Sequence, residues 1–174
     1  MLFRVFFIYI FSARSIYDDC GKEVLEKSEG CFRSHLFDDC LKTTTQLLRR
    51  RARNVTFLPG EIELDAMTTQ LKGQGLKDGH YKYNADGILR ANSFSNLEIM
   101  LSEVSCGYGK AEISKVSFDH YKGMFGLLAM LRTFAETYKE ASFDTFRKLK
   151  VHFLHGHGNY YLSYIYLFYS KIKY

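Results

Sequence analysis

The spacing of apolar and polar residues along the chain predicts helices in its first third. Between residues 16 and 53, apolar positions recur at intervals of three and four, a pattern typical of two amphipathic helices. The only proline, Pro59, is followed by Gly60, and this pair favours a turn. Acidic residues follow the turn and suit the positive end of a helix, so we expect a third helix over residues 61–72.

The middle and later parts of the chain predict a sheet. Residues 80–89 and 97–105 have strand character and are separated by a polar turn, and the second strand is apolar on both faces. Residues 117–138 repeat apolar positions as one long amphipathic helix, and a last strand is expected over 149–155. This order predicts an α/β fold, with a mixed sheet flanked by helices and additional helices at the N-terminus.

The two ends of the chain differ in composition from the domain expected over residues 16–158. Residues 1–15 are apolar and aromatic, which indicates either a signal peptide or a wrongly read start of the gene. Residues 159–174 form an aromatic tail whose origin as genuine protein sequence is doubtful. No segment approaches the roughly 20 apolar residues that span a bilayer, so no membrane span is expected.

Charge adds one candidate binding surface. The net charge of +5 permits an anionic partner such as nucleic acid without requiring one. Four arginines cluster within five positions and could contact phosphates or act as a nuclear address: Arg49, Arg50, Arg51 and Arg53. The alternative interpretation is a solvated basic helix end that interacts favourably with the helix dipole.

The cysteines bear on localisation rather than on chemistry. Cys20, Cys31, Cys40 and Cys106 have no C-x-x-C spacing, which argues against a zinc ribbon or a dithiol redox site. Reduced thiols in an intracellular protein are the favoured interpretation, with the nucleus as one location. A secreted protein is the alternative, and in that case Asn54 in N-V-T would be a glycan acceptor.

An acidic pair on the two predicted strands is the densest chemical signal. Glu103 in LEIMLSEVS shares a strand face with Leu101, and a carboxylate in such an apolar row is costly unless it is paired, hydrogen-bonded or bound to a cation. Asp86 in ADGIL lies on the neighbouring strand and could supply a second oxygen ligand to a divalent ion. Alternatively, Asp86 belongs to a strand-end turn and Glu103 to a buried ion pair.

These residues resemble a known signature. Asp86, followed after 16 residues by Glu103, Val104 and Ser105, resembles the D…(D/E)xK pattern of the PD-(D/E)XK phosphodiesterase superfamily, which includes the restriction endonucleases. The order of predicted elements is similar to the αβββαβ core of that superfamily. The same stretch is also similar to a set of uncharacterised fungal proteins, and the resemblance covers roughly residues 61–158.

The resemblance implies a metal-dependent phosphodiesterase that acts on nucleic acid. Asp86 and Glu103 would hold Mg²⁺ or Mn²⁺, which polarises the scissile phosphate and activates water. Glu63 would be a further, helix-borne acid in this set. Partner proteins and oligomeric state have no signature in the chain.

The lysine of the signature is missing, because Ser105 occupies its place. Lys82 lies four residues before Asp86 on the same predicted strand face, and Lys122 lies on the long helix, so either is a candidate replacement. If neither replaces it, the domain has lost catalysis and is a non-enzymatic interaction or nucleic-acid-binding module.

Three histidines near the last strand are a secondary candidate. His152, His155 and His157 alternate so that the last two share a strand face, where both could bind zinc. No cysteine or carboxylate lies at a typical ligand spacing, and a strand edge that runs into a glycine turn is the alternative.

Overall fold

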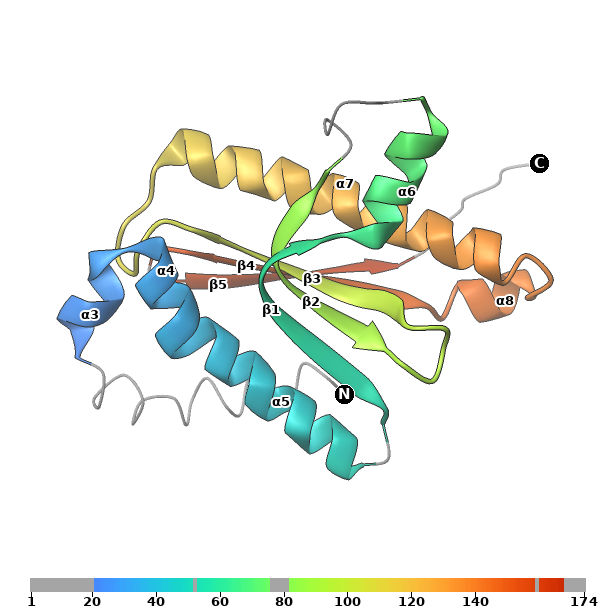
Figure 1. Ribbon diagram of the computed structural model, residues 1–174, viewed down its shortest axis with the longest axis horizontal. Helices are drawn as coiled ribbons and strands as arrows, with labels where there is room; N and C mark the ends of the chain where they lie inside the picture. The colour runs from blue at the N-terminus through green and yellow to red at the C-terminus, as the bar shows by residue number, and fades with distance from the viewer. Residues whose placement is uncertain (1–20, 52, 76–81, 159, 168–174) are drawn as a thin grey trace.

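The computed structural model describes residues 21–51, 53–75, 82–158 and 160–167 (Figure 1). The N-terminal segment 1–15 and residues 168–174 of the aromatic tail, on which predictions were made above, lie outside the described residues.

One mixed sheet forms the centre of the protein. Its strands are β1 (Val55–Glu63), β2 (Asn84–Ala91), β3 (Leu97–Ser105), β4 (Lys150–His157) and β5 (Tyr160–Leu167). They lie side by side in sequence order, with β3 and β4 parallel and every other neighbouring pair antiparallel. The mixed α/β sheet flanked by helices is therefore confirmed.

Helices cover both faces of the sheet. They are α3 (Lys22–Lys27), α4 (Glu29–Phe32), the π-helical turn η1 (Arg33–Phe37), α5 (Asp38–Arg50), α6 (Asp65–Gly73), α7 (Ile113–Thr137) and α8 (Phe143–Phe146). In Figure 1, α5 and α7 lie on opposite sides of the strands. Among the described residues, no helix combines the length and the apolar character needed to cross a membrane.

Alternation along the strands builds two separate hydrophobic cores. In β2, Leu89 packs in the core beneath α3 to α5, whereas its neighbour Ile88 packs in the core beneath α6 and α7. In β3, Met100 packs in the first of these cores and Leu101 in the second. Successive side chains of a strand point to opposite faces, so a strand covered on both sides is apolar throughout.

Helix α7 is the crossover between the two parallel strands. Parallel neighbours need a long connection, and α7 carries the chain from the end of β3 back to the start of β4. Two glycines let α7 approach the sheet closely. A Cβ added at Gly123 would overlap the Phe153 ring, and one added at Gly126 would lie 2.6 Å from Leu101 Cδ2.

The predicted turn at Pro59 and Gly60 and the predicted helix start at residue 61 are wrong, because this segment is part of β1. The register with β2 shifts between Pro59 and Ile62, so the pair forms a bulge rather than a turn. β1 is the edge of the sheet, where a missing N–H is tolerated, and Gly60 supplies a φ of 98°. The helix α6 begins only at Asp65.

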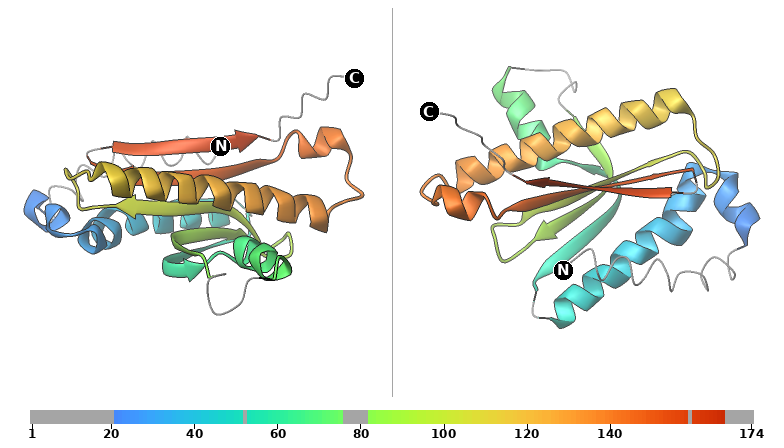
Figure 2. Two further views of the ribbon diagram at one scale, coloured as in Figure 1. Left: turned by 90° about the horizontal axis from the view of Figure 1, so that it is seen from above. Right: turned by 180° about the vertical axis from the view of Figure 1, so that it is seen from behind.

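The other predicted elements occur with shifted ends. The strand over 97–105 is β3 with the same bounds, while α7 begins earlier than expected, at Ile113. The predicted strand over 80–89 begins at Asn84. Residues 160–167 of the segment interpreted as a tail pair with β4, so the sheet extends beyond the expected domain end at residue 158 (Figure 2).

Candidate active site

Asp86 lies where the β2–β3 ladder ends. The last paired residues are Gly87 and Ser102, and beyond them the Asp86 carboxylate takes the place of the ladder, since its Oδ2 accepts the backbone N–H of Val104 at 2.7 Å. The side chain is almost fully buried. A buried carboxylate must be hydrogen-bonded or paired, and this contact meets part of that requirement.

A cation from the helical layer completes the surroundings of Asp86. Arg33, the first residue of η1, places Nη1 2.8 Å from Asp86 Oδ1 and 3.8 Å from Glu61 Oε1. Glu61 lies within the bulge of β1, and its carboxyl pKa is raised by burial, by repulsion from Asp86 and by a hydrogen bond with Asp86. Two acids therefore share one guanidinium.

Glu103 is held by Lys122 of α7. The Lys122 Nζ lies 2.9 Å from Glu103 Oε1 and 3.0 Å from Oε2, and it also lies 5.2 Å from the centre of the Tyr83 ring. Burial raises the pKa of Glu103 to about 8, since Lys122 offsets only part of the desolvation and the nearby Asp86 and Asp119 add repulsion. A proton and the ammonium thus compete for this carboxylate near neutral pH.

Ser105, at the position of the missing lysine, belongs to a buried polar network. Its Oγ lies 2.5 Å from Asp119 Oδ2, to which it donates, and 2.9 Å from His155 Nε2. Burial lowers the pKa of His155 to about 4, so its ring is neutral at pH 7. The one hydroxyl hydrogen of Ser105 is donated to Asp119, so the hydrogen in the contact between Ser105 and His155 comes from Nε2. In a Ser-His-Asp triad the histidine accepts from the serine, so this network is not one.

The carboxylates of Asp86 and Glu103 are suitable ligands for a hard divalent cation, but in this structure both are occupied by ion pairs. Mg²⁺ uses one or two carboxylates together with water, and Asp86 and Glu103 provide such a pair. Each carboxylate is already paired with Arg33 or Lys122. In the described part of the chain, no group of three or more His, Cys, Asp or Glu side chains is placed to hold a metal ion. An ion here would rest on two carboxylates and water.

Two other predicted site residues, Lys82 and Glu63, do not lie where the sequence predicts them. Lys82 is exposed and precedes β2, which starts at Asn84, so it does not lie on the strand face of Asp86. Glu63 is the last residue of β1, opposite Asn84, and is borne by a strand rather than by a helix. The acid that reaches Asp86 from this segment is Glu61.

The arginine run lies at the far end of the sheet from Asp86. It directly precedes Val55, which pairs with Ala91 at the end of β2 remote from Asp86. Arg49 is used internally, since its Nε donates to Val55 O at 2.7 Å. All four arginines of the run are exposed: Arg49, Arg50, Arg51 and Arg53. A phosphate surface on this run would therefore be separate from the acidic pair.

Several residues of the site are not apparent in the sequence. Arg33 lies 53 residues before Asp86, and nothing in its own segment indicates a partner that far along the chain. Asp119 and His155 meet only through Ser105, from α7 and β4. Glu61 had a readable signal, because Pro-Gly can mark a bulge in an edge strand as well as a turn.

Comparison with known proteins adds no relative: no family model, curated protein or solved structure matches this chain. The functional argument therefore rests on the site itself.

Proposed function

We propose that the chain is a degenerate PD-(D/E)XK-like domain that acts as a metal-dependent phosphodiesterase on nucleic acid, with Lys122 in the role of the missing lysine. The observation that carries the proposal is the contact of Lys122 Nζ with both carboxylate oxygens of Glu103. It brings a lysine to the second acid of the signature from another element, while Ser105 is turned into its own network.

The order of elements supports the same proposal. Helix α5, the antiparallel strands β1, β2 and β3, the crossover helix α7 and the parallel strand β4 occur in the αβββαβ order, with α6 inserted between β1 and β2 and the short α8 between α7 and β4. The sequence pattern predicts only two strands before the long helix, and β1 brings their number to the three that the order requires. Fold alone does not establish function, so the residues carry the weight.

The proposed roles follow from position and charge. A divalent cation bound by Asp86 and Glu103 would supply the Lewis acid that polarises the phosphate and lowers the pKa of water. Lys122 would donate to a phosphate oxygen and stabilise the charge that develops there. The backbone N–H of Val104 holds Asp86 in place. The Tyr83 ring beneath the ammonium limits the positions of the Lys122 side chain.

A cleavage assay with a pair of lysine variants tests this proposal. Labelled single- and double-stranded DNA and RNA are incubated with the chain in Mg²⁺ or Mn²⁺. Lys122→Met should lower the rate by about 10²-fold or more, the scale of losing one preorganised donor. Lys82→Met is the matched control and should cleave normally. Loss of cleavage in Lys82→Met with retention in Lys122→Met would refute the assignment, and an inactive wild type would refute the enzyme.

The alternative is a non-catalytic module that kept the fold, and the Arg33–Asp86 ion pair specifically favours it. A guanidinium 2.8 Å from Asp86 Oδ1 supplies the positive charge that a metal ion would otherwise bring. Titration with Mn²⁺ separates the two functions. An enzyme should bind Mn²⁺ as the wild type and lose binding in Asp86→Asn, whereas a module should bind none until Arg33→Met frees the carboxylate.

A further inference from the structure

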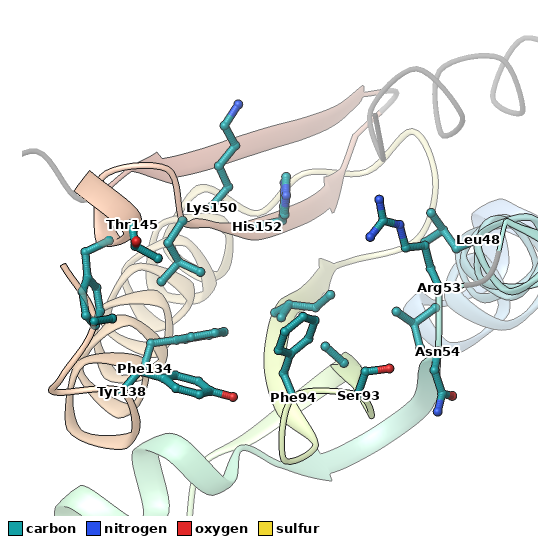
Figure 3. Close-up of a pocket in the computed structure, with 16 residues that line it drawn as sticks. Leu48, Arg53, Asn54, Ser93, Phe94, Phe134, Tyr138, Thr145, Lys150 and His152 are labelled. Carbon is teal, nitrogen blue, oxygen red and sulfur yellow. The ribbon is translucent and has the colours of Figure 1, made fainter. Parts of the chain in front are cut away.

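A pocket of about 910 Å³ opens at the end of the sheet remote from Asp86 and Glu103 (Figure 3). Val55 and Ala91, paired at that end of the β1–β2 ladder, line it together with Lys150 at the start of β4. Its volume lies within the range of roughly 300–1,000 Å³ that is typical of small-molecule sites. The proposed phosphodiesterase site does not use it.

Apolar and aromatic side chains form most of the pocket wall. Phe134 comes from the last turn of α7, Tyr138 directly follows that helix, Phe146 lies in α8 and Phe94 in the β2–β3 turn. Ile99 of β3 contributes to both hydrophobic cores and also lines the pocket. Such a wall binds the apolar body of a ligand by removing it from water.

The charged residues of the pocket are all of one sign. Arg53 and Lys150 line it, and no aspartate or glutamate does. In the part of the chain that the structure describes, neither cation forms an ion pair. Figure 3 shows Arg53 reaching inward from the side of α5, whereas the Lys150 side chain starts at the opposite wall and points away from the centre of the pocket.

We propose that this pocket binds an amphipathic organic anion, with an apolar chain along the aromatic wall and one carboxylate at Arg53. The apolar lining excludes a strongly hydrophilic ligand such as a sugar phosphate, and the unbalanced positive charge selects an acid over an alcohol or amine of the same shape. His152, at the pocket wall, has its pKa lowered to about 4 by burial and by Lys150, so it is neutral at pH 7 and the positive charge of the pocket comes from Arg53 and Lys150.

A displacement experiment on the full chain tests the ligand class. The fluorescent acid 11-(dansylamino)undecanoate should bind with enhanced emission, and decanoate should displace it at about tenfold lower concentration than decanol, the scale of a hydrogen bond to a charged group. Equal displacement by decanol, or no binding of the dansyl acid, would overturn the proposal. Pelleting of the chain with phosphatidylserine vesicles without decanoate binding would also overturn it, in favour of a membrane surface.

Two variants and a matched control locate the site. Arg53→Glu should weaken decanoate binding by about tenfold or more, while Arg50→Glu, an exposed arginine of the same run outside the pocket, should leave it unchanged. Ala141→Trp, at a half-buried position of the wall, should fill the space and abolish binding of both probes. Circular dichroism melts show whether each variant folds. Folded Arg53→Glu and Ala141→Trp proteins that bind decanoate like the wild type would refute the assignment.

Discussion

The Glu103 carboxyl should make the protein less stable as the pH rises through neutrality. Its pKa is raised from 4.5 to about 8 in the folded protein, chiefly by burial. Between these values the folded state holds a proton that the unfolded state releases, so the contribution of Glu103 is fully present below about pH 4.5 and is lost as the pH approaches 8. One pKa unit corresponds to about 1.4 kcal/mol, so the whole range amounts to about 5 kcal/mol.

The Glu103→Gln variant isolates this effect, because an amide has nearly the shape of the protonated acid and does not titrate. Urea unfolding at pH 5 to 8.5 gives the free energy of unfolding of both proteins. As the pH rises from about 5 to 8, the free energy of unfolding of the variant should increase relative to that of the wild type by about 1.4 kcal/mol per pH unit. Subtracting the two curves removes the contributions of His152 and His155, whose pKa values are lowered from 6.5 to about 4 and which therefore change the stability between about pH 4 and 6.5.

Glu136→Gln is the matched control, since this carboxylate is exposed on α7 and, among the residues that the structure describes, forms its ion pair with Arg132. Its curve should run parallel to that of the wild type. Parallel curves for Glu103→Gln would refute the reasoning, because they would mean that Glu103 has the same proton affinity in the folded and unfolded chains.

Two further substitutions test how the elements around the site are held. Gly123→Ala should lower the free energy of unfolding by about 1–3 kcal/mol, because its Cβ overlaps the Phe153 ring, and Phe153→Leu in the same chain should recover part of that loss in urea unfolding. Glu98→Ala removes the acceptor of the Asp65 and Ala66 N–H groups at the start of α6 and one partner of Arg90, which should cost about 2–4 kcal/mol in the same measurement. Glu98→Gln, which keeps one acceptor oxygen, should lose less.

The elements predicted correctly are those whose own residues specify them. β3 is apolar on both faces because helices cover both sides of the sheet, and the apolar run in the sequence has the same bounds as the strand. α7 repeats apolar residues over many turns, so its period is unmistakable. β1 was missed because Pro59 and Gly60 are turn residues in isolation. Only the position of this strand at the sheet edge makes a bulge possible there.

The residues of the candidate site likewise fall into those that their own segment indicates and those that depend on how distant segments pack. Asp86 and Glu103 could be found because a carboxylate in an apolar strand is anomalous within its own segment. Lys122 could be named as a candidate from its helix, but its contact with Glu103 depends on how α7 crosses the sheet. Arg33 could not be found. Its role depends on the π-helical turn η1, which inserts an extra residue into the helix and changes the direction of the side chains around it.

The two cations at the acidic pair carry opposite implications for function, and they can be tested separately because they come from different elements. Lys122 lies on α7 and pairs with Glu103, in the way a relocated catalytic lysine would. Arg33 lies on η1 and pairs with Asp86, in the way a substitute for a metal ion would. In an active enzyme Arg33 must leave Asp86 when the ion binds, so Arg33→Met should tighten Mn²⁺ binding while Lys122→Met abolishes cleavage. In a module Arg33 is the permanent counter-ion, so Arg33→Met should destabilise the fold in the absence of metal, because a buried carboxylate would be left without its partner. Mn²⁺ that then binds to the freed Asp86 should restore no cleavage.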